Sequence, residues 1–85
     1  MRLNGAMDLE HRVLGKPGIL SVATRGDSGP GEVLLTVNGS TESYLAWSPA
    51  PLAKGTRVMV VAERGVRAVD IVATDDSGLP VLESN

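Results

Sequence analysis

The chain has 85 residues, enough for one small domain around a single hydrophobic core. The absence of cysteine excludes disulfide bonds and thiolate metal sites. With 8 Lys and Arg against 10 Asp and Glu, the net charge is −2, which disfavours binding to nucleic acid or to an anionic membrane surface. Because Phe is absent, the core must be mainly aliphatic, as suits a small, tightly closed barrel.

The first part of the chain predicts a linker followed by one strand. Residues 1–14 are expected to form a polar lead-in, part of which could remain from expression, with Met7, Leu9 and Val13 as its candidate core contacts. Residues 15–18 contain two glycines and a proline and should break this segment. Ile19–Thr24 is the first predicted strand, and the glycine-rich residues 25–31 predict a loop.

The middle of the chain predicts a hairpin. Glu32–Val37 and Ser40–Trp47 are the second and third predicted strands, and Asn38-Gly39 between them is a strong signal for a two-residue turn. Residues 48–51 contain two prolines, which lack the N–H that a sheet interior requires. This segment should therefore leave the sheet.

Two runs rich in β-branched residues flank Arg64-Gly65 and predict a second hairpin, formed by strands four and five. If these two residues form the turn, branched aliphatics meet on one face: Val60 opposite Val69, and Val58 opposite Ile71. The side chains expected on the other face are Arg57, Met59 and Glu63.

Five short strands predict an all-β fold, a small five-stranded OB-fold-like β-barrel over residues 15–73. A small SH3-like barrel or an open sandwich is the competing architecture. Residues 74–85 are rich in Asp, Ser, Gly and Pro and should form a flexible C-terminal tail. The longest apolar run, Val58–Ala62, is far shorter than the ~20 residues of a membrane helix, and the N-terminus lacks the apolar stretch of a secretory signal.

No group of residues has the pattern of a catalytic site. The single histidine, His11, has no partner nearby in the sequence, and Ser48 has neither a strand-to-helix turn nor a histidine to activate it. Asp75 and Asp76 are adjacent, so their side chains should diverge, and no third oxygen ligand is near. The glycines of residues 25–31 lack the Lys-Ser/Thr of a phosphate loop. We therefore expect no enzyme activity, no cofactor and no metal.

The two aromatic residues predict a partner-binding site at the end of the third strand. Tyr44 and Trp47 should point to opposite faces of the strand, so only one can be core unless the strand bends. Tryptophan is common at binding hot spots, and the nearby prolines lower the ordering cost of their loop. The predicted site residues are Tyr44, Trp47, Pro49, Pro51 and, as a polar rim, Arg57. In the alternative interpretation, Trp47 caps the barrel as core and Arg57 is a solvated strand end.

Nucleic acid is the usual ligand of an OB barrel, which stacks bases on aromatics within a basic groove. This chain has only two aromatics, and acidic residues lie between its arginines: Arg25, Arg57, Arg64 and Arg67. Nucleic acid is therefore not the expected partner. A soluble OB-fold domain that binds single-stranded nucleic acid remains the alternative function.

Five short motifs in order carry a resemblance to a known family: Gly15-Lys16-Pro17-Gly18, Gly29-Pro30-Gly31-Glu32-Val33, Asn38-Gly39, Ala46-Trp47-Ser48, and the segment Leu52–Val61. Together, from about Leu14 to Ala73, they resemble the C-terminal soluble domain of the NfeD family. One departure is Leu45, at a position where many relatives have an acidic residue.

The resemblance implies an OB-fold domain that follows transmembrane helices, usually on the cytoplasmic side; those helices are absent from these 85 residues. NfeD-family proteins are encoded beside stomatin- or flotillin-like membrane proteins, with which the domain is thought to act. Longer members add a serine protease domain, which explains their description as regulators of membrane protease activity. The expectation is a non-catalytic protein-interaction domain of a membrane-anchored protein with a stomatin/flotillin-like partner. The oligomeric state, the membrane orientation and the contact face are left open.

Overall fold

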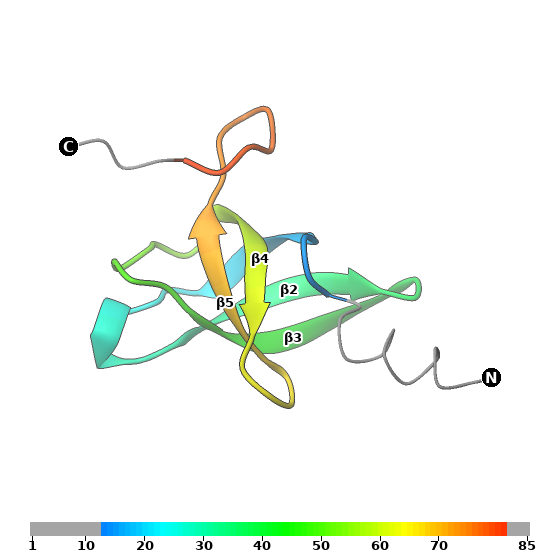
Figure 1. Cartoon of the computed structure of the whole chain (residues 1–85), viewed down its shortest axis with the longest axis horizontal. Coiled ribbons are helices and arrows are strands. Elements are labelled where there is room, and N and C mark those ends of the chain that lie inside the picture. The colour runs from blue at the N-terminus through cyan, green and yellow to red at the C-terminus, as the bar shows by residue number, and fades with distance from the viewer. Residues whose placement is uncertain (1–12, 82–85) are drawn as a thin grey trace.

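The structure is a computed structural model and describes residues 13–81. Within this range the chain forms five strands and one short 3-10 turn: β1 (Pro17–Val22), η1 (Gly26–Ser28), β2 (Gly31–Val37), β3 (Ser40–Trp47), β4 (Arg57–Glu63) and β5 (Ala68–Ala73) (Figure 1). The bounds of β3 are as predicted, and β2 begins one residue earlier. The expectations for Met7, Leu9 and His11 fall outside the described residues.

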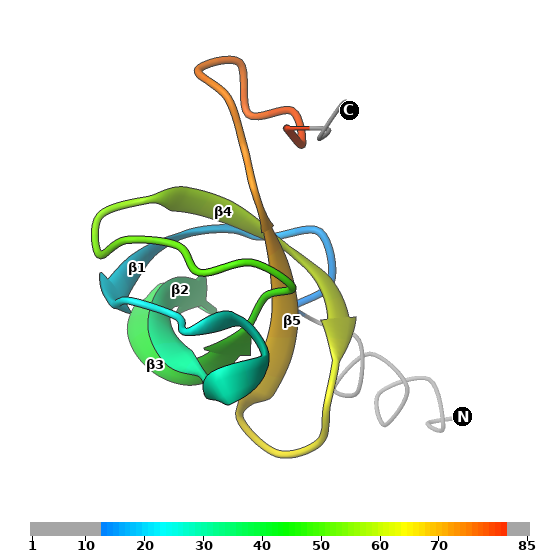
Figure 2. The same ribbon diagram turned by 90° about the vertical axis from the view of Figure 1, so that its left-hand side faces the viewer.

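The five strands close into a barrel in the order β1-β2-β3-β5-β4, with β4 pairing back onto β1. All neighbouring pairs are antiparallel except β3 and β5, which run parallel. Viewed near the barrel axis, the strands form a ring around the core (Figure 2). This confirms the predicted all-β, five-stranded OB-like barrel. Closure leaves few exposed strand edges, which limits edge-to-edge aggregation.

The β2–β3 hairpin forms as predicted, with Val37 paired to Ser40. Asn38 and Gly39 both have positive φ, 53° and 83°, as a two-residue turn of this kind requires. β1 begins at Pro17 rather than at Ile19, so residues 17–18 belong to the strand instead of breaking the chain. A Cβ atom on Gly18 would lie 2.7 Å from side-chain carbons of β2, so glycine allows β1 to cross β2 closely.

The predicted register of the β4–β5 hairpin is wrong. Val60 pairs with Ile71, and Val58 pairs with Ala73, because the turn spans residues 64–67 rather than two residues. Arg64 lacks the positive φ that a two-residue turn needs. The residues with positive φ in this turn are Gly65 and Arg67. A bulge between Val60 and Ala62 shifts the pairing by one residue within the hairpin. The four residues predicted for the core face are therefore still buried: Val58, Val60, Val69 and Ile71.

The core is aliphatic, as the composition predicts, with one tyrosine added. Every strand contributes at least one buried side chain, and the segment before β1 contributes one more. The buried set is Val13, Leu20, Val33, Leu35, Val37, Tyr44, Ala46, Val58, Val60, Val69 and Ile71. Strict alternation along β2 places three of these inside and leaves Leu34 and Thr36 exposed.

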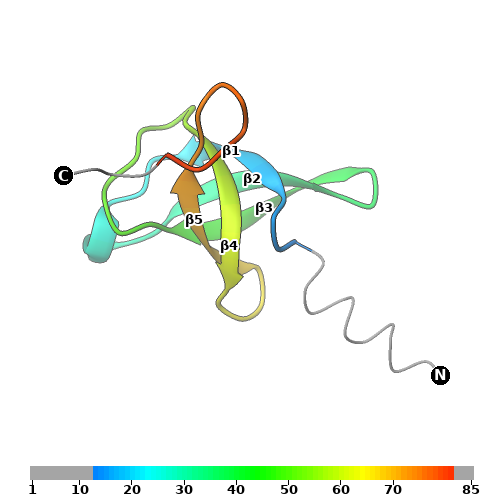
Figure 3. The same cartoon turned by 45° about the horizontal axis from the view of Figure 1, so that its top comes forward.

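Two loops are held by side-chain hydrogen bonds. Thr24 Oγ1 lies 2.7 Å from Ser48 Oγ and accepts a 2.8 Å bond from the Leu52 N–H, which ties the segment after β1 to the proline-rich loop. Beyond β5, Asp75 Oδ1 accepts bonds from the N–H groups of Ser77 and Leu79, and a bridge between Thr74 and Pro80 closes this turn. Figure 3 shows this turn at the opposite end of the β4–β5 ribbon from residues 64–67.

Candidate partner-binding site

Tyr44 and Trp47 lie on opposite sides of β3, as predicted. Tyr44 is in the core with 7% of its surface exposed, whereas Trp47 is half-buried at the barrel wall. The parallel pairing of β3 with β5 places Trp47 beside Asp70. Trp47 is therefore the aromatic that remains near the surface.

Each aromatic ring is covered by an arginine from the β4–β5 loop. The Arg64 guanidinium lies 4.6 Å from the centre of the Trp47 ring and also binds the Asp70 carboxylate at 2.8 Å. Arg67 lies 4.8 Å from the Tyr44 ring centre and binds Glu42 at 2.6 Å. Stacking of this kind stabilises both the ring and the loop.

These arginines were not predicted as part of the site. Their role depends on the four-residue turn, which brings Arg67 back over β3, and on the parallel contact between β3 and β5. The six-residue spacing of Arg64 and Asp70 across a hairpin is the one sequence signal that could have indicated their pairing.

The corner around Trp47 holds a shallow hollow of about 180 Å³, lined by Gly26, Asp27, Trp47, Ser48, Pro49, Arg64 and Asp70. Pro49 thus lies with Trp47 in the lining of this hollow. Pro51 lies against the neighbouring 3-10 turn. The evidence is its distance from Gly26: a Cβ atom placed on Gly26 would be 3.4 Å from Pro51 Cδ.

Arg57 does not belong to this corner. It lies at the first position of β4, whereas Arg64 follows the last, a separation of about 20 Å along an extended strand. Arg57 instead pairs in register with Ile19 of β1. The predicted rim residue therefore lies at a second surface.

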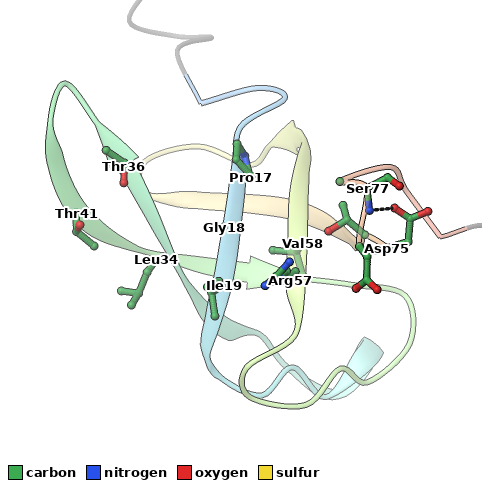
Figure 4. Close-up of a pocket in the computed structure, with 13 residues that line it drawn as sticks. Pro17, Gly18, Ile19, Leu34, Thr36, Thr41, Arg57, Val58, Asp75 and Ser77 are labelled. Atoms are coloured by element: carbon green, nitrogen blue, oxygen red, sulfur yellow. Dashed lines mark hydrogen bonds between the residues drawn. The ribbon is translucent and has the colours of Figure 1, made fainter.

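That second surface is an open groove of about 600 Å³ on the outside of the barrel, lined by Pro17, Gly18, Ile19, Leu34, Thr36, Thr41, Arg57, Val58 and residues 74–78. Figure 4 shows Ile19 and Arg57 beside each other, with Leu34 on the next strand and the Asp75 turn beyond Arg57. Ile19 is 50% exposed and Leu34 is 40% exposed, and the two are cross-strand partners. Within residues 13–81, Arg57 makes no ion pair.

Sequence reasoning did not identify this groove. The available signal was the alternation along β2: Leu34 lies between two core residues, Val33 and Leu35, so its side chain must point outward. A large aliphatic side chain at such a position has to be covered by something else or remain exposed.

The polar side chains singled out earlier have structural roles. The Ser48 hydroxyl donates a 2.7 Å bond to the Ala50 carbonyl and contacts Thr24. The Asp75 carboxylate caps its own turn. Among residues 13–81, no three His, Cys, Asp or Glu side chains are grouped so as to hold a metal ion. In the same range, no helix has the length and apolar character to span a bilayer.

Comparisons with known proteins agree with this architecture. No curated protein matches the chain in sequence. Among solved structures, the soluble domain of the NfeD protein YuaF from Bacillus subtilis is 26% identical with a TM-score of 0.63, covering 84% of this chain and 90% of that one. The C-terminal domain of stomatin operon partner protein 1510-C from Pyrococcus horikoshii is 20% identical with a TM-score of 0.61, covering 79% of this chain and 95% of that one.

A model of one protein family matches the barrel itself. The model describes the NfeD C-terminal domain and covers residues 17–72, from the start of β1 almost to the end of β5. The matched range is most of the chain and includes residues of all five strands of the barrel. The chain therefore belongs to the NfeD family through its C-terminal domain.

Proposed function

We propose that this domain is a non-catalytic contact module through which an NfeD-type membrane protein binds a stomatin-like protein. The observation that carries the proposal is the family match over residues 17–72. A structural relative with the same fold is named a stomatin operon partner protein, which suggests the class of partner. The full-length protein would be anchored in a membrane with this barrel on the cytoplasmic side, and residues 1–14 would connect the two.

The barrel surface supports binding to a protein rather than catalysis. Exposed aliphatic side chains are present on its outer face, with Ile19 and Leu34 as cross-strand partners in a groove. Apolar area of this kind gains free energy when a partner covers it. Ser48 and Asp75, the polar groups considered for chemistry, are engaged in hydrogen bonds that hold loops.

By binding its partner, the module would contribute to the regulation of membrane protease activity. In this proposal the barrel acts as an adaptor that positions the stomatin-like protein beside a protease, and the proteolytic chemistry resides elsewhere.

Single-stranded nucleic acid is a weaker candidate. Base stacking needs free aromatic faces, but Arg64 lies over Trp47 and Arg67 lies over Tyr44. Both arginines are also paired with carboxylates, so they offer less charge to a phosphate backbone. We therefore favour the protein partner.

A direct titration tests the proposal. The chain is titrated against the stomatin-like protein encoded in the same operon, and separately against single-stranded DNA, at several salt concentrations. We expect a Kd of about 1–10 μM for the protein and no binding to DNA in that range. Absence of binding to the stomatin-like protein, or micromolar DNA binding that weakens steeply with salt, would overturn the proposal.

A further inference from the structure

The outer face of β1, β2 and β3 presents four aliphatic side chains that no other part of the described chain covers. Ile19 and Val22 of β1, Leu34 of β2 and Leu45 of β3 are each between 40% and 50% exposed. We call these four residues the aliphatic face. One or two exposed aliphatics are common on a protein surface, but four on adjacent strands are not.

The strand register brings these side chains together. Ile19 pairs with Leu34, and Val22 and Leu45 flank Glu32 on its two sides. Leu34 and Glu32 are two residues apart on β2, so they share one face of the strand. Val22, Leu34 and Leu45 therefore adjoin Glu32, and Ile19 extends the face beside Leu34. The face is continuous with the groove, which Ile19 and Leu34 also line.

Glu32 lies at the centre of the face with its charge uncompensated. It is half-buried, and its Oε1 atom accepts a 3.1 Å bond from the Ser43 hydroxyl. Within the described residues it makes no ion pair. A partner that covers the aliphatic side chains would bury this carboxylate, at a high cost in free energy unless it supplies a positive group.

The backbone of this face is not available for strand addition. At these positions β2 pairs with β1 on one side and with β3 on the other; Ile19 of β1 also pairs with β4, and Leu45 of β3 also pairs with β5. Recognition must therefore use side chains. The element that commonly packs its apolar side on a sheet face is an amphipathic helix.

We propose that the aliphatic face binds an amphipathic helix of the partner that carries a Lys or Arg among its aliphatic side chains, with the positive group placed against Glu32. This inference rests on the proposed function for the identity of the partner, but not for the chemistry of the helix. It also places the main contact on the β1–β2–β3 face rather than at the Trp47 corner.

The first arm of the test uses the stomatin-like protein of the same operon and variants of this chain. Leu34→Ser and Leu45→Ser should each weaken binding about tenfold or more, and Glu32→Lys should weaken it further by repelling the partner's positive group. Val61→Ser is the matched control, because Val61 is 47% exposed on β4, outside the face. Binding by Leu34→Ser and Leu45→Ser that equals binding by the unmodified chain would overturn the proposal.

The second arm does not depend on that partner. Two synthetic helical peptides of about 18 residues carry the same leucine stripe, flanked by Lys in one and by Glu in the other. The unmodified chain should bind the Lys peptide, Leu45→Ser should bind it about tenfold more weakly, and Glu32→Lys should prefer the Glu peptide. Equal binding of both peptides by the unmodified chain would refute the helix chemistry.

The two arms distinguish failure of the proposed function from failure of the proposed helix binding. If the stomatin-like protein does not bind but the peptides behave as expected, the proposed function fails and the chemistry of the face holds. Sedimentation of the chain alone completes the test: a dimer that is lost in Leu34→Ser would show that a second copy covers the face, which would overturn the proposal of a helix.

Discussion

The guanidinium of Arg64 lies 4.6 Å from the centre of the Trp47 ring while it binds the carboxylate of Asp70 at 2.8 Å. Three residues from three segments are thereby joined: the end of β3, the β4–β5 loop and β5. Because the parallel β3–β5 contact places Trp47 directly beside Asp70, one arginine can reach both. The loop and the barrel wall are held together by this arrangement.

Removal of Arg64 should uncover one face of Trp47. Trp47 is the single tryptophan of the chain, so its fluorescence reports on this contact alone. We expect Arg64→Ala to shift the emission to longer wavelength and to increase quenching by iodide. The free energy of unfolding should fall by no more than about 1 kcal/mol, because the ion pair is exposed. Arg67→Ala, which uncovers Tyr44 instead, is the control; an Arg64→Ala spectrum like that of the unmodified chain would contradict the stacking.

Charge placed in the core should unfold the barrel, whereas charge on the adjacent residue should not. Val60 is 1% exposed and Val61 is 47% exposed, so the same substitution probes the two sides of β4. Val60→Asp buries an unpaired carboxylate and should lower stability by more than about 4 kcal/mol, enough to unfold a small domain. Val61→Asp should cost less than about 1 kcal/mol. Chemical denaturation followed by circular dichroism measures both; similar losses would show that the orientation of β4 is wrong.

The hydroxyl of Thr24 should matter more than its size. Thr24→Val keeps the shape of the side chain but leaves the Leu52 N–H and the Ser48 hydroxyl without this partner. We expect a loss of about 1–3 kcal/mol in the free energy of unfolding, the cost of an unsatisfied buried polar group. The exposed Thr36 provides the control, since Thr36→Val should change stability by less than about 0.5 kcal/mol. Equal losses of unfolding free energy in the two variants would show that the Thr24 hydrogen bonds do not stabilise this loop.

Much of the fold could be predicted from the sequence because local signals set it. Asn38-Gly39 specifies its turn through the positive φ that both residues adopt, and β2 alternates without interruption. The opposite orientation of Tyr44 and Trp47 followed from their spacing alone. In each case, residues close in sequence determine the result.

The predictions that failed depend on backbone irregularities without a sequence signal or on residues distant in sequence. The β4–β5 register required a bulge after Val60 and a positive φ at Arg67, a residue type that rarely adopts it. The separation of Arg57 from Trp47 follows from the closure of the barrel, which aligns Arg57 with Ile19. The aliphatic face could not be recognised before the strand order was known, because its members come from three strands.

The most direct test of the account maps the contact surface in solution. Backbone amide shifts of the isotope-labelled chain are followed by NMR as the stomatin-like protein is added. We predict that the shifts which change most belong to residues 19–22, 32–34 and 43–45, with smaller changes at residues 47–51 and 64–70. Changes confined to residues 47–51 and 64–70, or no changes at all, would contradict the claim that the outer face of β1, β2 and β3 binds the partner.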